Sequence, residues 1–217
     1  GSYDDAVAES AALATDDVLV VSDTAWPGYT DVPRRVIDGY STIFDECDEQ
    51  LSGAAPDIVL VQMGVGALAA AVVEHYAGRA VIVGVEPTSA ACNLVSAAAG
   101  KPVSTPGPHP SIMAGLNCGN VSPVAWPSVS RGVDVFVAIE DAGAEQAMRD
   151  LAASGVVAGE TGAAGLGGLR ALADAGAQAH GVELHDRTVL LLCTEGATDP
   201  EAYERIVGPA ATPRVQK

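Results

Sequence analysis

The sequence is poor in basic and aromatic residues, and each shortage excludes something. Its 11 lysines and arginines stand against 28 acidic residues, which gives a formal net charge of −17. Such an acidic chain cannot present a basic surface to the phosphates of nucleic acid or to an anionic membrane, so we expect neither partner. Aromatic residues make up 4% of a chain that is 48% hydrophobic. We therefore expect a core built mainly from Val, Leu, Ile and Ala.

Cysteines and long apolar runs are also scarce. The four cysteines, Cys47, Cys92, Cys118 and Cys193, lie far apart and form no C-x-x-C pair. This pattern favours free thiols and a cytoplasmic location over a disulfide framework. The histidines show no ligand spacing, so we expect no metal site. No signal peptide and no apolar run of about 18 residues or more is visible.

The most informative stretch present covers residues 57–73. An apolar run ends at Gln62, two glycines follow at Gly64 and Gly66, and a run of small and aliphatic residues begins at Ala67. The first part predicts a strand that is buried on both faces. The glycines allow a sharp turn, and the N-terminus of the next helix offers free N–H groups and a positive dipole end. The stretch therefore predicts a phosphate site at residues 64–67.

Short apolar runs alternate with helical patterns along the rest of the chain. Strands are predicted at 18–21, 57–62, 80–85, 133–139 and 188–192, and helices at 3–14, 33–51, 89–99, 112–116, 141–154, 162–175 and 200–207. The alternation predicts an α/β fold in three layers, with a mostly parallel twisted sheet and helices on both faces. Ligands in such folds bind beyond the carboxyl ends of the strands. Asp23, Glu86, Cys193 and Thr194 follow predicted strands.

One interpretation of the glycine turn is a dinucleotide site. Residues 64–69 fit the form G-x-G-x-x-A, and Glu86 closes the next predicted strand. A dinucleotide-binding fold places the acid that binds the ribose at about this point. An NAD-binding module is therefore one candidate, and a tight turn with no ligand is another.

Six motifs, in this order, support a different interpretation: Ser22-Asp-Thr-Ala-Trp26, Val61-Gln-Met-Gly-Val-Gly-Ala67, Val85-Glu-Pro87, Ser111-Ile-Met-Ala-Gly-Leu116, Gly159-Glu-Thr-Gly-Ala163 and Cys193-Thr-Glu-Gly-Ala-Thr-Asp199. Together they resemble the C-terminal portion of the diaminopropionate ammonia-lyases. That family belongs to the tryptophan-synthase-β-like, fold type II pyridoxal-phosphate enzymes. The resemblance runs from about Tyr3 to Val207. It accounts for all six motifs, whereas the dinucleotide interpretation accounts for one.

The resemblance implies where a pyridoxal 5'-phosphate cofactor would bind. Its phosphate would be held by the backbone N–H groups of Gly64, Val65, Gly66 and Ala67. Glu160 corresponds to an acid near the cofactor ring. Either Cys193 or Thr194 would lie beside the pyridine nitrogen, as a neutral partner that makes the ring a weaker electron sink than a carboxylate would. Without a ligand, Glu160 could be a helix-capping acid and Cys193 a small buried hydrophobe.

Asp23 matches a family aspartate that acts on the substrate. A carboxylate at a strand exit can remove a proton from the substrate Cα if it lies within hydrogen-bond reach. The alternative is that Asp23 forms an Asx-type turn before Pro27. Cys92 and Cys118 match two family cysteines that approach one another near the mouth of the site, although we expect separate thiols.

The resemblance also calls for a Schiff-base lysine, which this sequence does not place in the family motif. Its two lysines are Lys101, in a loop rich in Gly and Pro, and Lys217, the last residue. We therefore expect a truncated chain: residues 1–32 would be a remnant of a smaller N-terminal domain, and residues 33–217 the large cofactor-binding domain. We expect this chain alone to be inactive and to bind the cofactor weakly or not at all.

The parent protein, as the resemblance implies, is a homodimeric lyase that acts on a small amino acid. It would convert 2,3-diaminopropionate to pyruvate and ammonia. A serine/threonine-type deaminase, which would expel water instead, is the first alternative. An NAD-binding module and a non-catalytic fragment with a structural role are the others.

Overall fold

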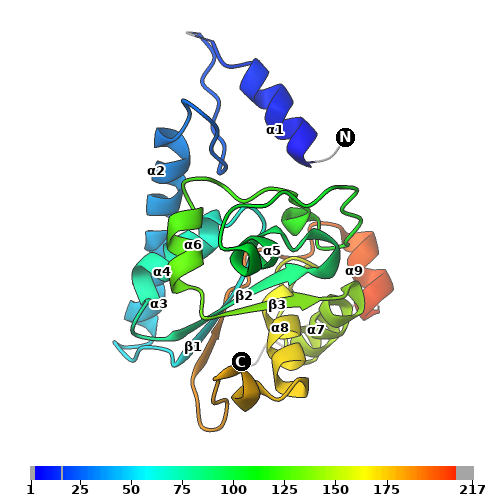
Figure 1. Cartoon of the computed structure of the whole chain (residues 1–217). Coiled ribbons are helices and arrows are strands. Elements are labelled where there is room, and N and C mark those ends of the chain that lie inside the picture. Colours follow the sequence, from blue (N-terminus) through cyan, green and yellow to red (C-terminus); the bar gives the residue numbers. More distant parts are fainter. Residues whose placement is uncertain (1–2, 16, 209–217) are drawn as a thin grey trace.

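A parallel four-stranded sheet forms the middle layer of the molecule (Figure 1). The computed structural model of the chain describes residues 3–15 and 17–208. The strands are β1 (Ile58–Gln62), β2 (Val81–Pro87), β3 (Val135–Ile139) and β4 (Val189–Leu191), in the order β3-β2-β1-β4. All neighbouring strands are parallel. Parallel pairing needs long crossover connections, which the helices between these strands provide.

Helices cover both faces of the sheet, and alternate residues of β1 show how the core is divided. Val59 and Val61 pack into one hydrophobic cluster, while Ile58 and Leu60 pack into another on the opposite face. The first face carries α2 (Asp31–Gly39), α3 (Ser41–Gln50), α4 (Ala67–Tyr76) and α6 (Trp126–Gly132). The second carries α7 (Asp141–Ala153) and α8 (Ala164–Asp174), with α9 (Pro200–Val207) packed on α7. This arrangement confirms the predicted three-layer α/β fold.

The N-terminal part of the chain is built differently. Helix α1 (Tyr3–Ala12) lies apart from the sheet in Figure 1, and residues 13–30, here called the arm, lead from it to α2. The prediction of a strand at residues 18–21 is wrong. In the described residues Val18 forms one isolated bridge, with Thr15, and Leu19 and Val21 are 79% and 70% exposed. Among the described residues the apolar run has no neighbouring strand to pair with, so its hydrophobicity does not produce a strand.

Most predicted helices are present, with shifted ends. The helix predicted at 33–51 is two helices, α2 and α3, interrupted at Tyr40. Gly39 precedes the interruption, and glycine is a poor helix former. Helix α5 (Cys92–Ala99) follows a short 3₁₀ turn at Thr88–Ala90, and two further 3₁₀ turns lie at Ala114–Leu116 and Ala177–His180. The sequence reasoning missed α6. No helix in the described ranges is both long and apolar enough to cross a membrane.

Candidate functional site

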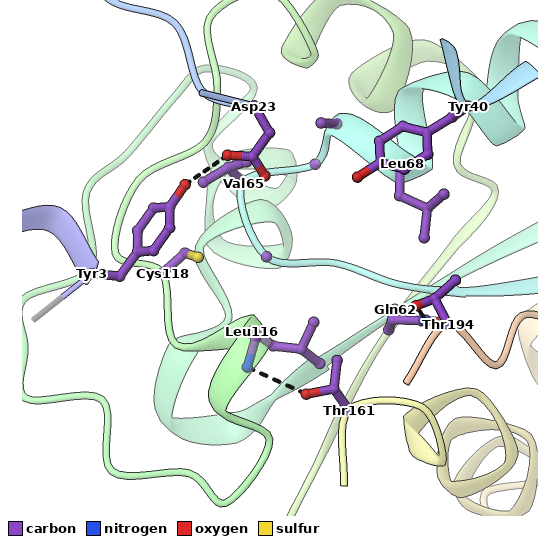
Figure 2. A pocket seen from close by; sticks show the side chains of 14 residues that line it. Tyr3, Asp23, Tyr40, Gln62, Val65, Leu68, Leu116, Cys118, Thr161 and Thr194 are labelled. Atoms are coloured by element: carbon purple, nitrogen blue, oxygen red, sulfur yellow. Dashed lines mark hydrogen bonds between the residues drawn. The ribbon is translucent and has the colours of Figure 1, made fainter. Parts of the chain in front are cut away.

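A cavity of about 140 Å³ lies at the carboxyl end of β1 (Figure 2). Its walls come from the start of α1, the arm, the loop between β1 and α4, and the chain segments around Leu116, Thr161 and Thr194. These segments are far apart in the sequence. Their meeting point is the edge of a parallel sheet at which ligands bind in open α/β folds.

The loop between β1 and α4 presents backbone groups to this cavity, and residues Gly64, Val65, Gly66 and Ala67 all line it. Gly66 is the N-cap residue of α4 and has a φ of 96°. The first bond inside the helix is donated by Ala70 N–H to the Gly66 carbonyl at 2.8 Å. Earlier N–H groups of the first turn have no intrahelical partner, and the positive end of the helix dipole faces the same space. This geometry suits an anion.

The packing around the two glycines is tight. A Cβ atom on Gly64 would lie 3.0 Å from Cys118 Sγ and 3.0 Å from the Gly115 carbonyl oxygen. A Cβ atom on Gly66 would lie 3.1 Å from Asn93 Oδ1. At these two positions the loop therefore presents backbone and no side chain to the cavity.

Asp23 reaches the same cavity from the arm. Tyr3, at the start of α1, donates its hydroxyl hydrogen to Asp23 Oδ1 at 2.8 Å, and the two side chains point toward one another in Figure 2. Burial and the nearby Asp23 carboxylate raise the pKa of Tyr3 well above its ordinary value. Tyr3 is therefore a protonated donor over the physiological range, and it holds one carboxylate oxygen of Asp23 in place.

Of the two candidate ring partners, the structure brings Thr194 to the cavity. Thr194 lines the cavity, and Gln62 Nε2 donates to its Oγ1 at 2.9 Å. Thr194 accepts that bond, so its own hydroxyl hydrogen stays available for a ligand. Cys193 is exposed, does not line the cavity, and points its Sγ to the Glu195 carbonyl oxygen at 3.6 Å. Gln62 was missed, although it is a polar residue at the end of an apolar strand.

Glu160 does not line the cavity, whereas its neighbour Thr161 does. Thr161 Oγ1 accepts the Gly115 N–H at 3.2 Å, and the Thr161 N–H is donated to Glu195 Oε2 at 2.8 Å. Thr161 thus joins two loops of the cavity wall. The motif that suggested Glu160 contains Thr161, but nothing in the sequence indicates which of the two faces the cavity.

Glu86 lies behind the loop, not in the cavity. It is 0% exposed and accepts hydrogen bonds from Asn93 and Leu94 in the first turn of α5. Burial raises the pKa of this carboxyl group to about 7, although these bonds oppose the shift. A carboxylate enclosed in this way has no access to a ribose, which counts against the dinucleotide interpretation.

The cysteines and the other possible metal ligands of the described residues form neither a disulfide nor a metal site. All four cysteines are free thiols. Burial raises the pKa of Cys92 well above its ordinary value and that of Cys118 to about 12. In the part of the chain that the structure describes, no three His, Cys, Asp or Glu side chains are grouped as metal ligands would be.

The chain is similar in sequence to one protein family and to individual known proteins. Residues 1–194 match the model of a family described as pyridoxal-phosphate dependent enzymes. Diaminopropionate ammonia-lyase from Escherichia coli K12 is 36% identical over 204 residues, which cover 87% of this chain and 51% of the relative. The L-threonine dehydratase of Mycobacterium leprae is 41% identical over 98 residues, 44% of this chain and 22% of the relative.

The fold is similar to solved structures of diaminopropionate ammonia-lyase. A crystal structure of the Escherichia coli diaminopropionate ammonia-lyase, in complex with an aminoacrylate–PLP reaction intermediate, superimposes with a TM-score of 0.85 at 34% identity. The match covers 94% of this chain and 56% of that one. The same enzyme has also been crystallised in complex with D-serine. The chain thus spans about half the length of the curated diaminopropionate ammonia-lyases it matches.

Proposed function

This chain belongs to the pyridoxal-phosphate-dependent enzyme family, and from that premise we propose that its cavity is the cofactor and substrate site of a diaminopropionate ammonia-lyase. The similarity to the diaminopropionate ammonia-lyases confirms the resemblance drawn from the six motifs. The observation that carries the proposal is one cavity that combines the backbone of the glycine loop at residues 64–67, here called the cradle, with the carboxylate of Asp23 and the hydroxyl of Thr194. The reaction would convert 2,3-diaminopropionate to pyruvate and ammonia.

Residues of this chain would hold both ends of the cofactor, the phosphate group and the pyridine ring. Residues 64–67 would hold the phosphate through backbone N–H groups and the dipole of α4. Thr194, oriented by Gln62, would donate its hydroxyl hydrogen to the pyridine nitrogen. Thr194 replaces Cys193 in this role because it alone of the two lines the cavity. When bound, pyridoxal phosphate supplies an electron sink for charge that develops at the substrate Cα.

Asp23 would take the proton from the substrate Cα. Tyr3 occupies Oδ1 by donating a hydrogen bond to it, which leaves Oδ2 to accept the proton. Tyr3 is a positioning residue in this scheme, because it acts through Asp23.

The elimination also needs a Schiff-base lysine, and we propose that residues outside this sequence supply it. Lys101 is exposed and does not line the cavity, and Lys217 lies outside the described residues. The 217 residues by themselves would then be inactive and would bind pyridoxal phosphate without a covalent bond. A domain boundary at residue 32, a homodimeric parent protein and a cytoplasmic location remain predictions.

Binding and turnover can be tested separately. The 217-residue chain should bind pyridoxal phosphate at least about tenfold more tightly than pyridoxal, because only the former has a phosphate for the cradle. Isothermal titration calorimetry with both compounds and with NAD measures this preference. The chain should release no pyruvate from 2,3-diaminopropionate, while a longer protein that adds the lysine should do so. Equal affinity for the two compounds contradicts the cradle, and steady pyruvate release by the chain alone contradicts its inactivity.

A serine/threonine-type deaminase is the second candidate, favoured by the similarity to the Mycobacterium leprae threonine dehydratase. The two activities differ in the leaving group, which is ammonia from 2,3-diaminopropionate and water from serine or threonine. The longer protein should be assayed with all three substrates. A higher kcat/KM with serine or threonine would replace the first candidate with the second.

A further inference from the structure

The interior behind the β1–α4 loop holds a polar pair that the proposed function leaves unused. Glu86, in β2, and Asn93, in the first turn of α5, are both 0% exposed. Burying a carboxyl group and an amide costs free energy unless hydrogen bonds satisfy them. The groups that hydrogen-bond to this buried pair therefore indicate its structural role.

The hydrogen bonds of the pair lead to the glycine loop. Glu86 Oε1 accepts from the Asn93 backbone N–H at 2.8 Å and from Asn93 Nδ2 at 2.9 Å. Glu86 Oε2 accepts from the Leu94 N–H at 2.8 Å. Asn93 Nδ2 also donates to the Gly64 carbonyl oxygen at 2.8 Å. Glu86 thus orients the amide of Asn93, and that amide holds the first residue of the cradle.

Holding the Gly64 carbonyl has a geometric consequence. In a trans peptide the C=O of one residue and the N–H of the next point in opposite directions. With the Gly64 oxygen drawn inward to Asn93, the Val65 N–H must face the other side of the peptide plane. Val65 and Cys118 both line the cavity. Asn93 thereby sets the direction of a cradle donor.

Asn93 also contacts the second glycine. Its Oδ1 lies 3.1 Å from the position that a Cβ atom on Gly66 would occupy, and it has no hydrogen-bond partner in the described residues. We propose that Asn93, held by Glu86, is a positioning residue that shapes the β1–α4 loop for the phosphate group of the cofactor. The choice of phosphate as ligand rests on the proposed function, whereas the effect on the loop does not.

The test uses Asn93→Leu, which keeps a side chain of similar size and removes both N–H donors. Ser96→Ala is the matched control, because Ser96 is a buried polar residue of the same helix whose hydroxyl bonds to Val103 and not to the loop. Glu86→Gln is a second variant that keeps the shape of the pair if Asn93→Leu does not fold. The wild-type chain and each variant are compared by amide hydrogen exchange and by titration with pyridoxal phosphate and pyridoxal.

Asn93→Leu should make exchange at residues 65–67 about tenfold faster and weaken pyridoxal phosphate binding about tenfold, the loss expected for a net buried hydrogen bond. Pyridoxal binding should not change. Glu86→Gln should give the same pattern more weakly, and Ser96→Ala should leave both readouts unchanged. A folded Asn93→Leu or Glu86→Gln with unchanged loop exchange would overturn the inference. If the wild-type chain shows no preference for pyridoxal phosphate, the proposed function fails, and the exchange result still decides this inference.

Discussion

The β1–α4 loop and the N-terminal arm line the same cavity but differ in how deeply the elements beside them are buried. The loop follows a strand whose five residues are all buried, and it leads into a helix packed on that strand. The arm follows a helix with no buried residue and exposes apolar side chains such as Leu19. The difference indicates that the loop side of the cavity is part of the sheet core, whereas the Asp23 side chain is held by a hydrogen bond from Tyr3.

One buried serine connects the two regions. Ser122 donates its backbone N–H to the Val65 carbonyl oxygen at 2.8 Å, and its Oγ accepts the Ala25 N–H at 3.2 Å. Ser122 is 0% exposed. The arm is thus connected to the loop through Ser122, at a point two residues after Asp23.

The largest combined loss of stability and of pyridoxal phosphate binding should come from Gly66→Ala. A residue with a Cβ atom at a φ of 96° costs roughly 1–2 kcal/mol in strain, and here the added atom also meets Asn93 Oδ1. Gly78→Ala is the matched control, because Gly78 has a φ of 76° and an added Cβ there would meet nothing within 4 Å. Chemical denaturation should show a larger loss of stability for Gly66→Ala, and calorimetry should show loss of pyridoxal phosphate binding for that variant alone. Equal losses in both variants would mean that the loop is not tightly packed.

An intermediate effect, on the pH dependence of stability, should come from the buried carboxyl group of Glu86 behind the loop. The pKa of Glu86 is raised from 4.5 to about 7, so the folded protein binds this proton more tightly than the unfolded chain does. Its contribution to stability is complete below about pH 4.5 and is lost as the pH rises through 7. Glu86→Gln should remove this loss, as measured by urea unfolding between pH 4.5 and 8. An unchanged pH dependence in the variant would show that Glu86 titrates normally.

The smallest effect should come from the arm. Tyr3→Phe removes the hydrogen bond to Asp23 and should lower the free energy of unfolding by about 1 kcal/mol or less. Tyr40→Phe is the control, since Tyr40 lines the same cavity and its hydroxyl has no hydrogen-bond partner within the described residues. Its stability should stay close to that of the wild type. If Tyr3→Phe were as costly as Gly66→Ala, the arm would be as firmly built as the loop, and the contrast would not hold.

The same contrast explains which predictions succeeded. The strand at residues 57–62 and the turn at Gly64 and Gly66 were predictable, because burial on both faces and a required φ leave local marks in the sequence. The apolar run at 18–21 is similarly hydrophobic but forms no strand in the described part of the chain, where it has no neighbouring strand to pair with. The site roles of Asp23 and residues 64–67 remain predictions, with their side chains or backbone now placed around one cavity.

The sequence by itself determined the α/β layering and the family, because hydrophobic period and motif order are properties of the chain alone. Only the tertiary structure decided that Thr194 and not Cys193 faces the cavity, that Glu86 turns inward to Asn93, and that Tyr3 meets Asp23. Neighbouring residues such as Cys193 and Thr194 differ in direction, and that direction is set by bonds to distant residues such as Gln62. Hydrogen bonds between elements depend on how the elements pack, which a linear pattern does not record.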